Sequence, residues 1–348
     1  MQRKTQFGKS KKICGVILLT GKNFSGLKAA VSFALLVVFV AFFLLTASVF
    51  MIREEEEQQL ELQANPDVRI FRTSADSVDT VPLEEAVVGV LAGEMPADFD
   101  EEALKAQAVA ARSYILKRMP QPYGAGAAVH SGDADICDDF AHCQAYVDEN
   151  KRRENWGEQF VEKEKKIRAA VTATAGEVIT YDGAVVSPTF CSTCGGKTEN
   201  AADYWQSEVP ALQSVSCYWD TDAPKYLSHV YYTKAEMAAK LGISCEELAN
   251  LKITETAESG RVKTVTCGEK QWKGSAVRTA LGLNSTDFQW LADENGYLIT
   301  VKGFGHGVGL CQHGANGMAK AGADYKQILN HYYTDIEITS IDKLKLIS

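Results

Sequence analysis

Residues 29–52 form an apolar run of 24 residues without a charged side chain, AAVSFALLVVFVAFFLLTASVFMI. A helix of this length rises about 36 Å, which is enough to cross a hydrocarbon core of about 30 Å. A cleavable signal peptide is the alternative, but its apolar region is shorter, and no small-residue cleavage site follows promptly. The run therefore predicts a transmembrane helix.

The charges on either side of this run predict its orientation. Residues 1–28 carry seven Lys or Arg and no acidic residue, whereas four consecutive glutamates follow Arg53. The excess of positive charge places this basic tail in the cytoplasm and the rest of the chain outside. Of the 36 Lys and Arg, 29 lie after the run, against 45 Asp and Glu. That balance argues against a nucleic-acid partner. Residues 53–80 are polar and predict a solvated stalk, which leaves residues 81–348 as the outer domain.

The outer domain has helical patterns first and strand patterns later. Apolar spacing predicts helices at 83–91 and 101–118 and a charged helix at about 147–174. The Asp182-Gly183 pair predicts a hairpin turn. Further strands are expected at 229–233, 251–257, 261–267, 288–292 and 296–302, with short helices at 234–241, 275–281 and 312–331. Helices followed by hairpins favour an α+β fold over a parallel α/β sheet.

Residues 91–99, LAGEMPADF, place one carboxylate at the break between the first two predicted helices. Glu94 follows a glycine and stands two residues before Pro96. Its position alone does not assign it a function, because a glycosidase ordinarily needs a pair of carboxylates.

A cluster of soft and borderline metal ligands lies in residues 130–143, HSGDADICDDFAHC. His130, Cys137, His142 and Cys143 form a reasonable tetrahedral set for Zn²⁺, and four protein ligands would leave no open position, as in structural sites. A Cys137–Cys143 disulfide with two incidental histidines is the alternative, and the spacing does not decide between them. The state of the other outer cysteines also stays open as disulfide, free thiol or second metal site: Cys191, Cys194, Cys217, Cys245, Cys267 and Cys311.

Two glycine-rich stretches are candidate functional segments: TFCSTCGGKTENAADYW (189–205) and GFGHGVGLCQHGANGMAKAGADY (303–325). Glycines alternate from Gly303 to Gly309 with His306 among them. This alternation allows a ligand to approach the backbone closely. It also suits a tight turn in which His306 makes only a local hydrogen bond, and the residue types alone do not choose.

Taken together, VVGVLAGEMPADFDEEALKAQAVAARSYIL, FCSTCGGKTENAADYW and GFGHGVGLCQHGA resemble the successive signatures of the stage II sporulation protein D family. Members of that family are membrane-anchored lytic transglycosylases of endospore-forming bacteria. The resemblance covers about residues 81–340. The His/Cys cluster resembles the clostridial branch, which binds zinc in this region, and so favours one structural Zn²⁺ ion over the disulfide.

The resemblance implies that Glu94 is the catalytic residue. It would cleave the β-1,4 bond between N-acetylmuramic acid and N-acetylglucosamine in peptidoglycan glycan strands, leaving 1,6-anhydromuramoyl ends. We also expect His306 to lie in the same groove as Glu94. The resemblance implies these substrate-binding residues: Arg112, Ser113, Thr193, Lys197, Thr198, Glu199, His306 and Gln312. Ala211 departs from the family, where tyrosine is common, and leaves a substrate contact there open.

The family context implies a place in the mother-cell membrane, where the protein would remodel septal wall during engulfment. The implied partners are the sporulation amidase/endopeptidase, stage II sporulation protein P, and the membrane protein stage II sporulation protein M. Two other functions stay open. One is a zinc-dependent hydrolase of peptidoglycan peptides, and the other is a non-catalytic glycan-binding scaffold of the engulfment machinery.

Overall fold

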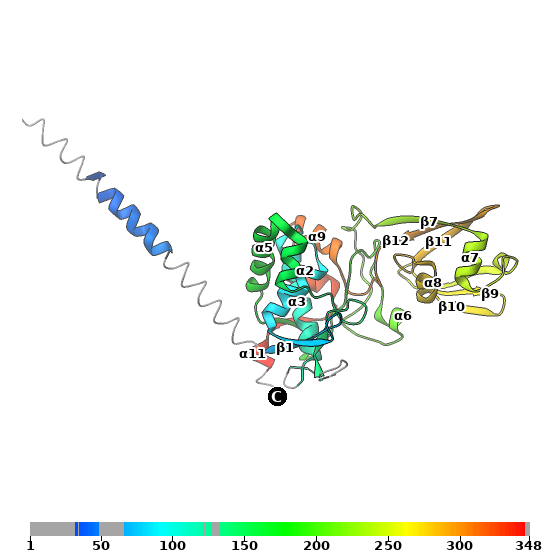
Figure 1. The fold of residues 1–348 in the computed structure, drawn as a ribbon, viewed down its shortest axis with the longest axis horizontal. Coiled ribbons are helices and arrows are strands. Elements are labelled where there is room, and N and C mark those ends of the chain that lie inside the picture. The colour runs from blue at the N-terminus through cyan, green and yellow to red at the C-terminus, as the bar shows by residue number, and fades with distance from the viewer. Residues whose placement is uncertain are drawn as a thin grey trace, which may run out of the picture. The chain divides into compact units, whose positions relative to one another are not determined.

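The computed structural model describes residues 32–33, 35–48, 66–120, 123–124, 126 and 133–344 (Figure 1). The chain divides into two units, Met1–Leu60 and Glu61–Ser348. In the first unit, residues 35–48 are helical. Among the described residues, no helix is both long enough and apolar enough to cross a membrane. Both ends of the predicted span 29–52 lie outside the described residues, so the transmembrane helix stays a prediction.

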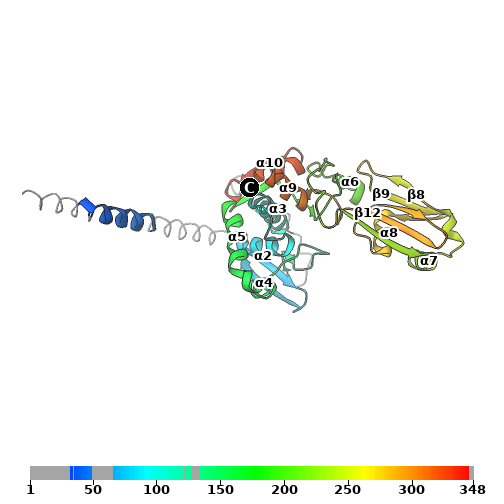
Figure 2. The same cartoon turned by 90° about the horizontal axis from the view of Figure 1, so that it is seen from above.

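The second unit is built around a central helix. The helix α3 (Glu101–Arg118) forms where the sequence predicted it, and its N-cap residue Asp100 accepts a hydrogen bond from the Glu102 amide. The helix α2 (Leu83–Glu94) starts as predicted but continues past the predicted end at residue 91. The middle of α3 is buried on every side, because its alanines let neighbouring backbones approach. It packs against α2, α5, α9 and α10 (Figure 2).

Two of the predicted helices, 147–174 and 312–331, are each divided in the structure. Residues 147–174 form α4 (Glu149–Trp156) and α5 (Phe160–Ala173), joined by a 3₁₀ turn at Gly157–Gln159. Gly157 ends α4 with a φ of 52° and a ψ of −124°, a backbone conformation that glycine adopts readily. Likewise, residues 312–331 form α9 (Gln312–Lys320) and α10 (Tyr325–Tyr332). Asp324 and Gln327 make a capping box that starts α10 as a new helix.

The predicted stalk is wrong for residues 67–80, which belong to the folded domain. The strands β1 (Asp67–Arg72) and β2 (Ser77–Pro82) pair as an antiparallel hairpin, and β3 (Ile136–Cys137) pairs with β1 in parallel. Val68 and Ile70 are fully buried in the main hydrophobic core. The polar composition of the segment concealed this short alternation of apolar and charged residues, so the predicted domain boundary at residue 81 falls too late.

A second hydrophobic core lies within residues 237–301 (Figure 2). Two antiparallel three-stranded sheets enclose it, in the orders β10-β9-β8 and β11-β12-β7. Their strands confirm the hairpin predictions closely, and two helices pack with them. These elements are β7 (Leu227–Thr233), α7 (Lys234–Leu241), η3 (Glu247–Asn250), β8 (Leu251–Thr256), β9 (Val262–Cys267), β10 (Lys270–Lys273), α8 (Gly274–Leu281), β11 (Asp287–Ala292) and β12 (Gly296–Lys302).

The remaining elements contribute their buried residues to the main core. The strands β4 (Glu177–Tyr181) and β5 (Ala184–Val185) form the predicted hairpin, in which Asp182 and Gly183 both have positive φ, as a type I′ turn requires. The others are β6 (Phe190–Cys191), α6 (Ala201–Trp205), β13 (Leu310–Cys311), β14 (Glu337–Ser340) and α11 (Ile341–Leu344). The mixture of helices with mostly antiparallel sheets confirms the α+β class for this unit.

Candidate functional site

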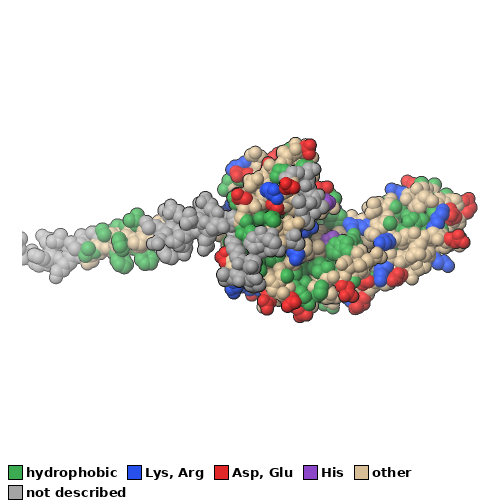
Figure 3. Space-filling model, turned by 90° about the horizontal axis from the view of Figure 1, so that it is seen from below, with side chains coloured by type: hydrophobic (Ala, Val, Ile, Leu, Met, Phe, Trp, Pro, Cys, Tyr) green, Lys and Arg blue, Asp and Glu red, His purple; other side chains and the backbone are tan. Residues whose placement is uncertain are grey.

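A cleft of about 500 Å³ opens beside the end of α2. Its walls come from the elbow between α2 and α3, the loop after β3, both glycine-rich stretches and α8. The lining includes Glu94, Tyr114, Gln144, Phe190, Arg278 and His306. The space-filling view shows histidine side chains beside hydrophobic ones on one face of the protein (Figure 3). A cleft of this size, with apolar walls and a few polar groups, is typical of a ligand-binding site.

The proline of the elbow puts Glu94 at the end of its helix. Pro96 disfavours helical backbone at Met95, which is extended with φ −124° and ψ 136°, so α2 ends at Glu94. The last carbonyls of a helix need partners from outside the helix. Gln312 donates its side-chain amide to the Glu94 carbonyl at 3.1 Å, although the two are far apart in sequence. The third sequence motif therefore holds the first in place.

The surroundings of Glu94 favour its protonated form. Burial raises the pKa of the Glu94 carboxyl, and a hydrogen bond from the Ala145 backbone N–H to Oε1, 2.6 Å long, offsets part of that rise. The C-terminal end of a helix also carries partial negative charge, which further disfavours a carboxylate. Glu94 thus combines a raised pKa with access to the cleft, as a general acid requires.

The acidic side chains of the cleft bear on the chemistry that it suits. Among the described residues that line it, Glu94 is the only Asp or Glu. Glycosidases that use water or a covalent intermediate place two carboxyl groups on either side of the bond they cleave. This cleft supplies one carboxyl group, the cationic Arg278 and several aromatic rings, among them Phe99, Tyr114 and Phe190. The arrangement suits chemistry in which one group acts first as acid and then as base.

His306 lies in the same cleft as Glu94, as the sequence led us to expect. Its Nδ1 accepts a hydrogen bond from the Val308 backbone N–H at 3.0 Å, and its ring centroid is 5.3 Å from that of Trp205. Burial, together with the nearby Arg261 and Arg278, lowers the pKa of His306 to about 4. The imidazole is therefore neutral at physiological pH. His306 both makes a local hydrogen bond and forms part of the cleft wall, the two alternatives that the sequence left open.

The alternating glycines serve the packing of the two glycine-rich stretches. Gly303, Gly305, Gly307 and Gly309 all have positive φ. A Cβ atom on Gly303 would lie 2.6 Å from the Thr193 carbonyl oxygen, and one on Gly309 would lie 2.1 Å from that of Thr189. The glycines are thus needed where one stretch crosses the other, and the approach of a ligand is not required to explain them.

Gln312 lines the cleft, whereas two other predicted substrate residues do not. Arg112 and Ser113 are fully buried in the core. The Arg112 guanidinium pairs with Glu84, with Nε 2.8 Å from Oε1, and also donates to the Glu177 and Val171 carbonyls. Ser113 accepts a hydrogen bond from the Ile179 amide. The predicted substrate contacts are not supported for this pair, because protein atoms enclose both side chains. Arg112 also orients Glu84, not Glu94.

The predicted substrate residues of the second motif also lie outside the cleft lining. Thr193 and Thr198 are fully buried, and Thr193 exchanges backbone hydrogen bonds with Phe304. Lys197 pairs with Glu258 at the surface. Glu199 is buried, accepts hydrogen bonds from Ser259 and the Asn200 amide, and borders a separate hollow of about 290 Å³. These four residues hold the two motifs and the second core together, so the structure does not support their predicted role in substrate binding.

Three of the four predicted zinc ligands converge, and the fourth, His130, lies outside the described residues. The ligand atoms of Cys137, His142 and Cys143 lie within 4.8 Å of one another. His142 Nδ1 is 3.6 Å from each of the two sulfur atoms. Cys137 is a free thiol, so the alternative Cys137–Cys143 disulfide is not formed. The donor set fits Zn²⁺.

Two polar residues of the cleft, Arg278 and Gln144, were not predicted from the sequence. Arg278 comes from α8, which is remote from Glu94 in the sequence. Its side chain donates a hydrogen bond to the Leu283 carbonyl. Gln144 is buried, and within the described part of the chain its side-chain amide has no hydrogen-bond partner. A buried amide without a partner is costly, so Gln144 is well suited to bind a ligand's hydroxyl or amide.

Comparison with known proteins finds similarity to one family of sporulation proteins. A family model described as stage II sporulation protein matches residues 72–181. The chain is 40% identical over 283 residues to stage II sporulation protein D of Bacillus subtilis (strain 168), covering 81% of each protein. It is 39% identical to stage II sporulation protein D of Bacillus amyloliquefaciens, covering 84% of each. The amidase enhancer of Bacillus subtilis (strain 168) is 27% identical over 72% of this chain and 40% of its own length.

Proposed function

The chain belongs to the stage II sporulation protein D family, a family of sporulation proteins, and on that basis we propose that it is a peptidoglycan lytic transglycosylase. The observation that carries the proposal is the single half-buried carboxyl group of Glu94 in a cleft with no second acid among its described lining residues. The substrate would be the glycan strand, cleaved between N-acetylmuramic acid and N-acetylglucosamine.

One carboxyl group suffices for this reaction. Protonated Glu94 gives its proton to the glycosidic oxygen as the bond from muramic acid C1 breaks, and the N-acetylglucosamine end leaves as an alcohol. The Glu94 carboxylate then removes the proton from the C6 hydroxyl of the same muramic acid, whose oxygen bonds to C1. The 1,6-anhydro ring closes, Glu94 is protonated again, and no water is consumed.

The products formed from purified peptidoglycan test this proposal. Mass spectrometry of the digest should find 1,6-anhydromuramoyl ends. Newly exposed amines would instead indicate a zinc-dependent peptide hydrolase, and reducing sugar ends would indicate an ordinary glycosidase. The absence of any product would favour a non-catalytic scaffold. The name of one relative, amidase enhancer, gives this last candidate some support, and in that case the chain would accelerate an added peptidoglycan amidase without cutting glycan itself.

We place the protein in the cell membrane with its N-terminus in the cytoplasm and its cleft outside, during engulfment. Support comes from the apolar run, the flanking charges and the family. Its partners would be stage II sporulation protein P and stage II sporulation protein M. Co-purification of the full-length chain from sporulating cells tests this assignment.

A structural zinc ion on His130, Cys137, His142 and Cys143 is also part of the proposal, and the last three of these are described residues that converge. The ligands would bind as thiolates and neutral imidazoles. Cys143 lies two residues before Ala145, whose backbone N–H donates to Glu94. The ion would therefore act on the reaction indirectly, by holding the loop that sets the position and the pKa of the catalytic carboxyl group.

Cys137→Ser should lower the zinc content, the thermal stability and the activity together. The loop would lose the bond that fixes Ala145 against Glu94, while the catalytic group itself stays in place. Elemental analysis, thermal unfolding and anhydromuropeptide release measure the three effects. Cys245→Ser, a change at an exposed cysteine outside the cluster, is the matched control. Unchanged zinc content in Cys137→Ser would exclude the cluster as the metal site.

The pH dependence of the rate should report the raised pKa of Glu94. Because the first step needs the protonated acid, kcat/KM should fall as pH rises through that pKa. Burial moves this limb above the ordinary glutamate value of about 4.3. Initial rates across the acidic to neutral range measure the limb. A limb at the ordinary glutamate pKa would show that the carboxyl group works as if it were solvated.

A further inference from the structure

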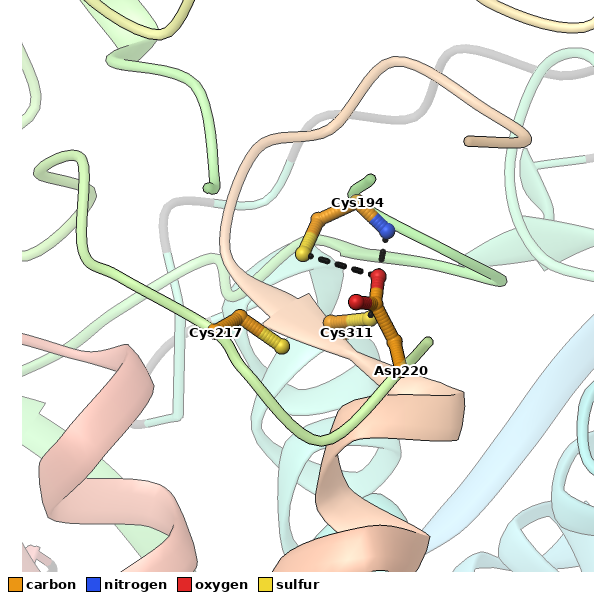
Figure 4. Close-up of side chains that lie close together, drawn as sticks. All are labelled: Cys194, Cys217, Asp220 and Cys311. Carbon is orange, nitrogen blue, oxygen red and sulfur yellow. Dashed lines mark hydrogen bonds between the residues drawn. The ribbon is translucent and has the colours of Figure 1, made fainter. Parts of the chain in front are cut away.

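Three cysteines and one aspartate meet in the interior, away from the predicted zinc cluster (Figure 4). Cys194 comes from the turn after β6, Cys217 and Asp220 from the segment before β7, and Cys311 from the start of α9. Their ligand atoms lie within 4.8 Å of one another, and all four residues are buried. No zinc-ligand pattern in the sequence marks this group, since its members are spread over more than a hundred residues.

The distances fit a small tetrahedral ion. Asp220 Oδ2 lies 3.2 Å from the Cys194 sulfur and 3.5 Å from the Cys311 sulfur. A Zn²⁺ ion with bonds of about 2.0–2.3 Å holds its ligand atoms about 3.5–3.8 Å apart. The side chains in Figure 4 point toward a common centre. Only small adjustments would be needed for all four to reach one ion.

Asp220 gives an independent reason to expect a cation. Its side chain has no exposed surface, and Oδ2 accepts a hydrogen bond from the Gly195 N–H at 2.8 Å. Its other oxygen, Oδ1, is buried and has no hydrogen-bond partner among the described residues. A buried carboxylate with an unsatisfied oxygen is costly unless it is paired or bound to a metal. No Lys or Arg forms an ion pair with Asp220 in the described part of the chain.

The backbone around the cluster is suited to hold thiolates. The Cys311 sulfur accepts hydrogen bonds from the amides of Cys194 and Gly314, at 3.2 and 3.4 Å. Cys311 also caps the N-terminus of α9, where the helix dipole stabilises negative charge. A Cβ atom on Gly314 would lie 2.4 Å from the Cys217 sulfur, so the close approach requires glycine.

A nearby positive charge would offset the excess negative charge of such a site. Arg261 is buried and donates to the Cys194 carbonyl oxygen at 2.7 Å. Its Nε and Nη1 have no hydrogen-bond partner among the described residues. Three thiolates and one carboxylate together carry more negative charge than one Zn²⁺ neutralises. The guanidinium beside Cys194 would therefore stabilise the filled site.

We propose that Cys194, Cys217, Asp220 and Cys311 bind a second structural Zn²⁺ ion, which joins the two glycine-rich stretches beneath the cleft. Four protein ligands leave no open position, so the ion would not take part in the reaction. Cys311 is followed by Gln312, which holds the Glu94 carbonyl, and Cys194 closely follows Cys191 and Ser192 of the cleft lining. The ion would thus fix two walls of the cleft relative to each other.

The full-length chain, purified in mild detergent with the first cluster removed by Cys137→Ser and Cys143→Ser, tests the proposal. It should still hold roughly one zinc ion per chain, because the second site supplies its own four ligands. Cobalt(II) loaded in place of zinc should show thiolate-to-metal absorption. Adding Cys217→Ala or Asp220→Asn should remove most of the metal, whereas Asp220→Cys should keep it by supplying a fourth thiolate. Cys267→Ser, at a buried cysteine of the second core, is the matched control and should leave the metal content unchanged.

Thiol mapping on the unaltered full-length chain tests the proposed second zinc site even if these variants do not fold. The proposal expects Cys194, Cys217 and Cys311 to resist alkylation in the native protein and to react as free thiols once a chelator and denaturant are added. A disulfide joining any of them, as the oxidising exterior permits, would overturn it. So would the absence of both zinc and cobalt–thiolate absorption in the protein that lacks the first cluster.

Discussion

Glu94→Gln should abolish the release of anhydromuropeptides while leaving the fold intact. The amide keeps the shape of the side chain and can still meet the Ala145 N–H through its oxygen, but it has no proton to give to the glycosidic oxygen. General acid–base catalysis contributes about 10²–10⁴-fold, so the rate should fall by at least about 100-fold. Product formation from purified peptidoglycan, followed by mass spectrometry, measures the loss.

The thermal unfolding midpoint distinguishes loss of chemistry from loss of structure. Removing a buried ionisable group should leave Glu94→Gln about as stable as the parent, or slightly more stable. Glu158→Gln, a change at an exposed glutamate outside the cleft, is the matched control and should keep full activity. If Glu94→Gln kept more than a tenth of the parent rate, the mechanism with one carboxyl group would be wrong for this protein.

Arg112→Met should be the most destabilising of the changes considered, although it lies outside the cleft. Arg112 and Glu84 form a fully buried ion pair that links α2 to α3. Removing the cation leaves the Glu84 carboxylate buried without its Arg112 partner, while the Gly176 amide still donates a hydrogen bond to it. Breaking such a pair typically costs about 3–5 kcal/mol. Chemical denaturation of the purified protein measures the change in the free energy of unfolding.

The double variant Glu84→Met/Arg112→Met separates the cost of an unpaired charge from lost packing. It should recover much of the stability that Arg112→Met loses, because no buried charge is left without a partner. If Arg112 instead contacted substrate, Arg112→Met would lower activity strongly with little effect on stability. That outcome would restore the role that the family resemblance implied.

The fold could be predicted well wherever the pattern is local. The ends of α3 and α7 and the hairpin at Asp182-Gly183 follow from helix periodicity, capping and turn residues that are neighbours in the sequence. The divided helices were harder to predict, since Gly157 breaks an otherwise continuous helical pattern. The β1–β2 hairpin was missed because its two buried residues, Val68 and Ile70, lie in a polar segment and find their core only through distant parts of the chain.

The residues of the candidate site also fall into those that local sequence predicted and those that only the fold revealed. The sequence by itself placed Glu94 at the break between two helices, and it grouped Cys137, His142 and Cys143 because they are close along the chain. The structure then showed that Glu94 is the last residue of α2. Only the tertiary structure decided that Arg112 and Thr193 are buried supports, that Arg278 and Gln144 face the cleft, and that four distant residues converge at Asp220. The physical reason is that burial and convergence depend on contacts between segments that are remote in sequence, whereas helix ends, turns and local ligand sets depend on residues within a few positions of one another.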